Sequence, residues 1–147
     1  MELIVLGISH KTASAQIRDE VQVHPEEMGS AYDALRVHSA ILRETAIIST
    51  CNRTEFYAFV EDGSEAERVL RATADELKGV GHFSGDSHAY ALTGKEAVRH
   101  LFRVASGLES MMVGEAQILG QVKETVEAAD RYKSMGAILT RLFNTAV

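Results

Sequence analysis

Hydrophobic and polar residues follow two different periods along the first 94 positions of the chain. A continuous apolar run at 3–8 and apolar-rich runs at 45–50, 54–61 and 88–92 are typical of β-strands. Apolar residues at helical spacing predict two amphipathic helices between these runs, at about 24–37 and 65–78. The order strand–helix–strand–strand–helix–strand (βαββαβ) predicts an α+β fold of the ferredoxin-like, split βαβ type, with an antiparallel sheet.

From residue 95 onward the pattern predicts only helices. A capping box made by Thr93 and Glu96 marks the start of the first one. His100 is expected on the side opposite its apolar stripe, which favours a surface histidine over a core histidine. A second helix is expected at about 115–133 and a third from 137. The apolar stripe of the first helix comprises Val98, Leu101, Phe102, Ala105 and Leu108.

The last predicted helix stops while its pattern is still apolar, with no cap, glycine or polar tail after it. A helix of this kind normally continues to a cap. We therefore expect this chain to be the N-terminal part of a larger protein, and we divide it into three regions. These are a ferredoxin-like part at 1–94, a helical part at 95–135, and the start of a truncated linker helix at 136–147.

Composition narrows the classes of function. With 147 residues, of which 46% are hydrophobic, the chain can form one ordinary core. One cysteine excludes an internal disulfide, and no segment approaches the ~20 apolar residues of a membrane helix, so we expect a cytoplasmic protein.

The net charge of −6 disfavours binding of long nucleic acid through the overall field, which leaves a local patch or another domain for any RNA contact. The six histidines show no metal-ligand spacing.

The single cysteine, Cys51, lies in Ser-Thr-Cys-Asn-Arg-Thr-Glu at 49–55, between two predicted strands. We expect a hairpin with this thiol at its tip. A free thiol has a pKa near ~8.5, so a cation such as Arg53 and a base such as His100 would raise its thiolate fraction. Unpaired cysteines are more often buried than reactive, but the polar neighbours of this one favour reactivity.

A glycine-rich segment at 79–85 is superficially similar to a dinucleotide-binding loop. Its third glycine is one position too late, and the segment follows a predicted helix rather than a strand. The sequence therefore predicts no nicotinamide site in this chain.

Three segments are not explained by packing: 7–13 (Gly-Ile-Ser-His-Lys-Thr-Ala), 49–55 and the long run 100–123. Together they resemble the N-terminal catalytic domain of the glutamyl-tRNA reductase family, over essentially the whole chain. The sequence departs from the family pattern at Ser9, at Ser14 and Ala15, and at Ala116, where the family usually has Asn, Pro-Val and Pro.

The resemblance implies an enzyme that forms a glutamyl thioester on Cys51 from glutamyl-tRNA(Glu). NADPH then reduces the thioester to glutamate-1-semialdehyde, the entry step of one route to tetrapyrroles. It also implies that NADPH binds a Rossmann domain absent from this chain, and that the full-length protein is a homodimer through absent C-terminal helices. The next enzyme of the pathway, an aminomutase, is a further expected partner. We expect this chain to accept the glutamyl group without completing its reduction.

Site residues follow from the resemblance position by position. Cys51 is the nucleophile, and His100 matches an activity-critical histidine that either polarises the carbonyl or handles protons. Arg53 is expected to bind the substrate's side-chain carboxylate and Glu115 its α-ammonium group. The remaining substrate-binding positions are Thr50, Asn52, Ser110, Ala116, Gln117 and Gln121. Alternatively, Arg53 is a solvated charge on the hairpin and Glu115 is an acid in the first turn of a helix. Gln117 and Gln121 would then be an exposed i,i+4 pair.

Two other functions stay open from the residues alone. The chain could be a non-catalytic ferredoxin-like module that binds a ligand or partner, with Cys51 structural and an exposed apolar tail at Leu139, Leu142 and Phe143 as the partner surface. It could also be a thiol hydrolase that uses no RNA.

Overall fold

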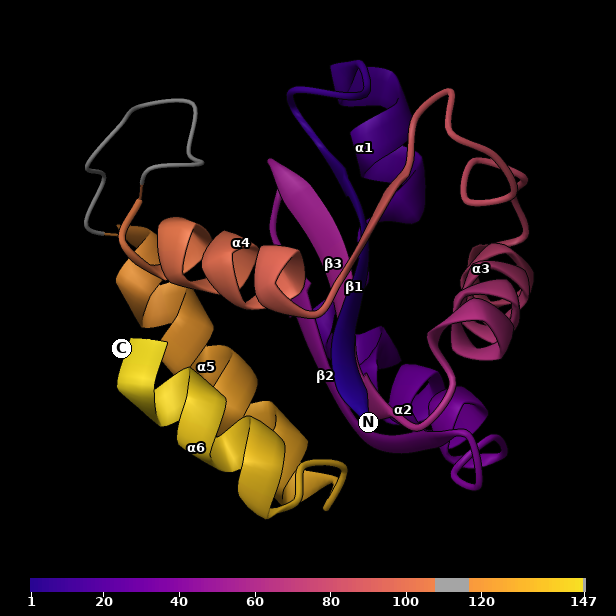
Figure 1. Cartoon of the computed structure of the whole chain (residues 1–147). Coiled ribbons are helices and arrows are strands. Elements are labelled where there is room, and N and C mark those ends of the chain that lie inside the picture. The colour runs from indigo at the N-terminus through magenta and orange to yellow at the C-terminus, as the bar shows by residue number, and fades with distance from the viewer. Residues whose placement is uncertain (108–116, 147) are drawn as a thin grey trace.

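The computed structural model in Figure 1 describes residues 1–107 and 117–146. Its centre is a four-stranded antiparallel sheet in the order β2-β3-β1-β4. This order, with β1 and β3 in the middle, is that of a split βαβ fold and confirms the predicted fold class. The strands are β1 (Glu2–Ser9), β2 (Leu42–Ser49), β3 (Arg53–Val60) and β4 (Tyr90–Thr93).

Helices cover both faces of the sheet (Figure 1). One face carries α1 (Ala15–Val21), the 3-10 turn η1 (Pro25–Glu27), α2 (Met28–Arg36) and α3 (Gly63–Lys78). The other carries α4 (Lys95–Ala105), α5 (Gln117–Arg131) and α6 (Ala137–Ala146). The central strand β1 is thus buried on both sides from Leu3 to Ser9, which explains its continuous apolar run.

Two local predictions are wrong. The segment after β1 contains a helix, α1, that was not predicted, because two turns are too short to show a period; Ser14 caps it by accepting a hydrogen bond from the Ile17 amide. The predicted capping box at Thr93 does not form. Thr93 stays in β4, paired with Ile4, and Gly94 is the N-cap of α4 with a φ of 60°.

The buried face of α4 also differs from the predicted one. Apolar residues lie on two adjacent sides of this helix. The side that packs on β1 and β4 is the one that includes the small residues Ala97 and Ala105, not the one with Val98 and Phe102. Phe102 is 38% exposed as a result. His100 lies next to the buried face, not opposite to it, so the predicted surface histidine has only 13% of its side chain exposed. The buried residues of α4 are Ala97, Leu101, Val104 and Ala105.

The last helix, α6, packs into the core. The Glu44 carboxylate of β2 accepts hydrogen bonds from the backbone amides of Gly136 (2.9 Å) and Leu139 (2.8 Å) at the start of this helix. Phe143 is fully buried against Tyr57, with ring centroids 5.4 Å apart in an edge-to-face arrangement. The expectation of an exposed partner surface at Leu139 and Phe143 is therefore wrong.

We expect Phe143→Ala to lower the free energy of unfolding by about 3–5 kcal/mol, because it leaves a cavity against Tyr57. Ile138→Ala, in the same helix but 43% exposed, should change it by only about 0.5 kcal/mol. Urea unfolding followed by circular dichroism measures both. Equal effects of the two substitutions would mean that α6 does not dock as described.

Candidate functional site

The turn between β2 and β3 holds the cysteine in a fixed loop. Cys51 is exposed and the flanking backbone is tied to the Thr50 hydroxyl, which accepts hydrogen bonds from the amides of Asn52 (3.1 Å) and Arg53 (3.3 Å). The His10 amide, just after β1, donates to the Asn52 carbonyl at 2.9 Å. The predicted hairpin with the thiol at its tip is confirmed.

A cation from α1 also supports this turn. Arg18 donates from Nε to the Cys51 carbonyl oxygen (3.3 Å) and from Nη1 to the Ala13 carbonyl oxygen (2.9 Å). Sequence reasoning missed Arg18, because the helix that carries it was itself not predicted. No sequence pattern signals that a side chain of a helix will bind the backbone of a turn more than thirty positions away.

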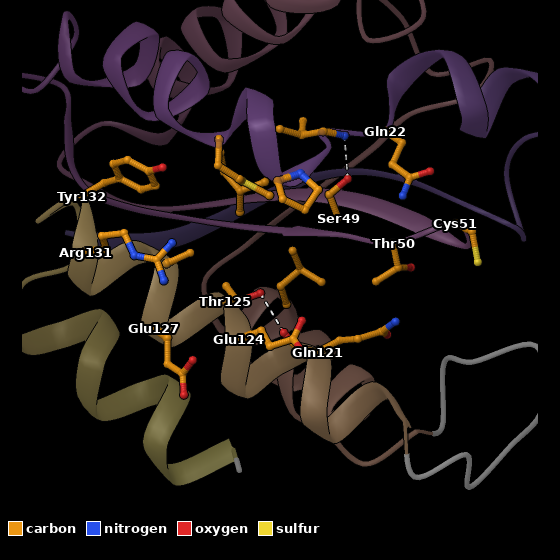
Figure 2. A pocket seen from close by; sticks show the side chains of 16 residues that line it. Gln22, Ser49, Thr50, Cys51, Gln121, Glu124, Thr125, Glu127, Arg131 and Tyr132 are labelled. Carbon is orange, nitrogen blue, oxygen red and sulfur yellow. Dashed lines mark hydrogen bonds between the residues drawn. The ribbon is translucent and has the colours of Figure 1, made fainter.

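A cavity of about 540 Å³ opens beside the cysteine, along the edge strand β2 (Figure 2). Cys51 and Thr50 lie at one end of this cavity, whereas Arg131 and Tyr132 lie at the other (Figure 2). Helix α5 forms one wall, with Gln121 nearest the cysteine end. The other wall comes from the connection between α1 and α2, where the Ser49 hydroxyl accepts a hydrogen bond from the Val23 amide at 2.8 Å.

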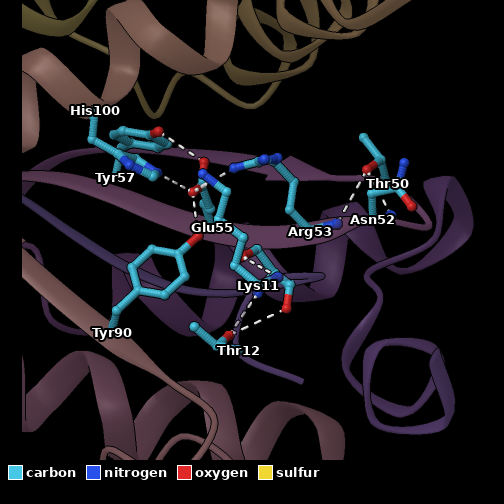
Figure 3. A network of polar contacts seen from close by, with 10 residues as sticks. Lys11, Thr12, Thr50, Asn52, Arg53, Glu55, Tyr57, Tyr90 and His100 are labelled. Carbon is cyan, nitrogen blue, oxygen red and sulfur yellow. Dashed lines mark hydrogen bonds and ion pairs between the residues drawn. The ribbon is translucent and has the colours of Figure 1, made fainter. Parts of the chain in front are cut away.

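The buried carboxylate of Glu55 contacts four side chains on the face of the sheet that α4 covers (Figure 3). Arg53 donates from Nη1 at 3.2 Å and the Tyr57 hydroxyl at 2.8 Å. The Tyr90 hydroxyl and His100 Nε2 both contact Glu55 Oε2. Alternation along β3 places Arg53, Glu55 and Tyr57 on the same face, while Tyr90 comes from β4 and His100 from α4.

Gly7 makes room for this cluster. It pairs with Tyr90 across the β1–β4 ladder, and a Cβ at this position would lie 2.6 Å from the Tyr90 hydroxyl oxygen. That distance is a steric clash, so only glycine lets the tyrosine cross β1 to Glu55. The first unexplained segment of the sequence therefore has a structural role in the site.

The protonation states in the cluster are set by its composition. Burial alone raises the pKa of Glu55, but the hydrogen bond and charge of His100, the Arg53 guanidinium and the Tyr90 hydroxyl outweigh it and lower that pKa to about 2. Burial and the negative charge of Glu55 raise the pKa of Tyr57 and Tyr90 well above the ordinary value. Glu55 is therefore ionised at neutral pH and both tyrosines are protonated donors.

The structure brings some predicted site residues together and separates others. Arg53 and His100 meet at Glu55, which sequence reasoning missed although it lies in the 49–55 segment. His100 Nε2 engages Glu55, so this nitrogen is not directed at the Cys51 thiol. The Arg53 side chain is only 2% exposed. Gln117 begins α5, and Ser110, Glu115 and Ala116 lie outside the described residues.

The glycine-rich segment after α3 does not fit a dinucleotide. Asp75 accepts hydrogen bonds from the Phe83 amide (2.8 Å) and the Ser84 hydroxyl, so a carboxylate occupies the loop where a phosphate would need free amides. Within the described residues there is also no group of three or more metal-ligating side chains. No helix among those residues is long and apolar enough to cross a bilayer.

Fold and site define a class of protein: a ferredoxin-like α+β domain with an accessible thiol at a hairpin tip and, on the same hairpin, a buried carboxylate that binds a histidine of α4. Residues 6–147 match the family described as glutamyl-tRNA(Glu) reductase, N-terminal domain. The chain belongs to this family.

Individual relatives agree with this assignment. The chain is 44% identical to a glutamyl-tRNA reductase of Citrifermentans bemidjiense, over 99% of the chain and 33% of the relative. It is 37% identical to that of Prochlorococcus marinus, over 100% of the chain and 34% of the relative. The solved glutamyl-tRNA reductase of Methanopyrus kandleri matches with a TM-score of 0.72 and 36% identity, over 98% of this chain and 32% of that one. The chain thus spans about a third of the length of its relatives.

We expect Glu55→Gln to lower the free energy of unfolding at pH 7 by about 3–5 kcal/mol, because it removes the charge of a fully buried carboxylate that pairs with the Arg53 guanidinium at 3.2 Å. The folded-state pKa of Glu55, about 2, is below its usual 4.5, so the ionised carboxylate stabilises the fold above about pH 5. This contribution is lost as the pH falls toward 2, and the difference between parent and variant should shrink over that range.

The matched control is Glu61→Gln, because Glu61 is half-exposed in its ion pair with Arg43. This variant should lose at most about 1 kcal/mol. Urea titrations of the three proteins between pH 7 and pH 3 measure the effect. A Glu55→Gln protein as stable as the control at pH 7 would contradict the buried ion pair.

Cys51 should react with a disulfide reagent in the folded chain, because its side chain is exposed at the turn. The rate should be the same with and without urea at concentrations below the unfolding transition. Cys51→Ser gives the blank, since the chain has no other thiol. Labelling that appears only as the protein unfolds would show that the cysteine is a buried structural residue.

Proposed function

We propose that this chain is the part of a glutamyl-tRNA reductase that takes the glutamyl group from glutamyl-tRNA onto Cys51. The observation that carries the proposal is an exposed thiol on a hydrogen-bonded turn, next to a cavity, in a chain of this family. A rigid turn favours covalent catalysis, because it holds the nucleophile in one place without further loss of entropy.

In the proposed step, the Cys51 sulfur attacks the carbonyl carbon of the aminoacyl ester. A carbon–sulfur bond forms, the carbon–oxygen bond to the terminal ribose breaks, and the thiol proton ends on the released ribose hydroxyl. No net oxidation or reduction takes place. The products are a glutamyl thioester on the chain and uncharged RNA.

Glu55 is proposed to position the two side chains that act on the substrate. It binds His100 through Nε2, so Nδ1 is the ring nitrogen that Glu55 does not engage. This arrangement orients the imidazole, as a carboxylate orients the histidine of a catalytic triad. We propose that His100 assists at the carbonyl or at the leaving oxygen through Nδ1.

Arg53 is proposed to select glutamate by binding its side-chain carboxylate. Its guanidinium is fixed by Glu55 at 3.2 Å, which keeps a bidentate donor in one orientation. Because the side chain is 2% exposed, the groups that cover it must move when substrate binds. Thr50, Asn52 and Gln121 border the turn and the cavity and remain proposed substrate contacts.

The later step belongs, in this proposal, to the rest of a longer protein. The glycine-rich loop after α3 does not fit a dinucleotide, so in this proposal NADPH binds another part of the longer protein and supplies the hydride for reduction of the thioester. Formation of glutamate-1-semialdehyde for tetrapyrrole synthesis, a homodimer through C-terminal helices and an interaction with an aminomutase are proposed for the longer protein only.

Mass spectrometry tests the proposal. The chain is incubated with glutamyl-tRNA(Glu), quenched at low pH to preserve thioesters, and weighed intact. We expect one added glutamyl group that is absent in Cys51→Ser and is removed by hydroxylamine. Glutaminyl-tRNA should give much less adduct, by a factor of ~10⁴ or more if Arg53 reads the carboxylate.

Two controls separate the rival functions. Free glutamate esters of a simple alcohol test for a thiol hydrolase that needs no RNA, and rapid turnover of them without charged RNA would favour that function. Addition of NADPH to the acylated chain should give no semialdehyde. A chain that never acquires the glutamyl mass, with a thiol that labels normally, would favour the non-catalytic binding module.

A further inference from the structure

Among the residues that the structure describes, Arg18 alone forms a hydrogen bond with Cys51 itself. Its Nε donates to the Cys51 carbonyl oxygen at 3.3 Å, and its Nη1 donates to the Ala13 carbonyl oxygen at 2.9 Å. The other hydrogen bonds of the turn involve the neighbours of the cysteine. One side chain of α1 therefore ties the residue that carries the thiol to the connection between β1 and α1.

The peptide unit that joins Cys51 to Asn52 is held at both of its polar groups. These two residues lie in the middle of the turn, between Thr50 and Arg53, whose backbones are joined by a hydrogen bond from the Thr50 amide to the Arg53 carbonyl (2.7 Å). The Asn52 amide donates to the Thr50 hydroxyl at 3.1 Å, and the Cys51 carbonyl accepts from Arg18. Because a peptide unit is planar, these two contacts together fix the orientation of its plane.

The orientation of the central peptide is the main variable of a tight turn. Turns of types I and II differ chiefly in a rotation of this peptide, which changes ψ of the first central residue and φ of the second. Arg18 keeps the Cys51 carbonyl oxygen bound to α1, while the Cys51 side chain lines the cavity (Figure 2). A rotated peptide would release this oxygen, whose partial negative charge opposes the charge that forms on a reacting ester.

The elements on which Arg18 acts are themselves ordered. The connection before α1 is closed by a hydrogen bond from the Ala13 amide to the Ser9 carbonyl at 3.0 Å. Near the other end of α1, the Glu20 carboxylate contacts Nε2 of His82 at 2.9 Å, in the loop after α3. Arg18 therefore reaches the cysteine turn from a helix that is anchored on both sides.

Arginine suits this position better than lysine. The planar guanidinium presents its N–H groups in fixed directions, so one side chain can bind two carbonyl oxygens at once. A lysine ammonium keeps the positive charge but lacks this fixed fork. Arg18→Lys therefore separates the shape of the side chain from its charge.

We propose that Arg18 is a positioning residue for acyl transfer, which holds the Cys51–Asn52 peptide in the orientation that lets the thiol attack the ester. This inference rests on the proposed function for its reaction. Arg18 acts through the backbone of Cys51 and takes no part in bond formation. Loss of the contact should slow the chemical step, because a nucleophile misplaced by about 1 Å loses rate by about 10²-fold.

The test measures single-turnover acylation of Cys51 by glutamyl-tRNA(Glu), followed by intact mass at several RNA concentrations. Arg18→Lys should lower the limiting rate at saturating RNA at least tenfold, and Arg18→Ala about 100-fold. The RNA concentration that gives half the limiting rate should change less than twofold. Added methylguanidine should restore part of the rate of Arg18→Ala, because it replaces the lost donor group.

Arg71 of α3 provides the matched control, because it also binds two carbonyl oxygens of a loop. Its Nη1 donates to the carbonyls of Phe83 and Gly85, both at 2.9 Å, and none of these three residues lines the cavity. Arg71 also has two acidic partners, so Arg71→Lys and Arg71→Ala should lose at least as much stability in urea as the Arg18 variants. They should nevertheless acylate at the parent rate.

Three results would overturn the proposal. The first is a limiting rate in Arg18→Lys equal to that of the parent. The second is a change confined to the half-saturating RNA concentration, since Arg18 would then bind RNA rather than position the thiol. The third is an equal loss of rate in the Arg18 and Arg71 variants, which would mean that acylation follows overall stability.

Hydrogen exchange of the Asn52 amide, measured by NMR without substrate, separates this proposal from the proposed function. Exchange should be at least tenfold faster in Arg18→Lys and unchanged in Arg71→Lys. If the parent never acquires a glutamyl group but Arg18→Lys alone exchanges faster, the acylation proposal fails and control of the turn by Arg18 is supported. If the parent is acylated while Arg18→Lys matches it in both rate and exchange, only the Arg18 proposal fails.

Discussion

The site depends on one buried interaction, the contact of the Glu55 carboxylate with its four donors. A carboxylate without exposure is tolerated only when its charge and lone pairs are met, and Arg53, Tyr57, Tyr90 and His100 meet them. These donors come from β3, β4 and α4. The same interaction that satisfies the charge therefore fixes how the helix that carries the histidine sits on the sheet.

Other parts of the fold support that carboxylate. Gly7 leaves the space through which Tyr90 reaches it, and Phe143 of α6 packs on the ring of Tyr57. The last helix and the first strand, far apart in sequence, thus both hold the donors in place. A site of this kind tolerates little change around it, because each donor is ordered by packing as well as by its hydrogen bond.

The Cys51 thiol is exposed to solvent, whereas the Glu55 carboxylate is buried. Cys51 is exposed on a turn that is fixed by the Thr50 hydroxyl, by His10 and by Arg18, and it lies at the mouth of a cavity rather than inside the core. A reactive group must reach its substrate, whereas the groups that orient the substrate gain strength from exclusion of water. The hairpin separates these needs, with the nucleophile at its tip and the charged cluster further along β3.

The sequence by itself determined the fold class, the hairpin around Cys51 and the family, because strand periods and contiguous motifs are local properties of the chain. It could not determine which apolar row of α4 faces the sheet, and so it misplaced His100. Nor did it single out Glu55, because a glutamate in a strand with alternating polarity gives no sign that its side chain is buried. Only the tertiary structure decided these points, since the environment of a buried charge is made by residues distant along the chain.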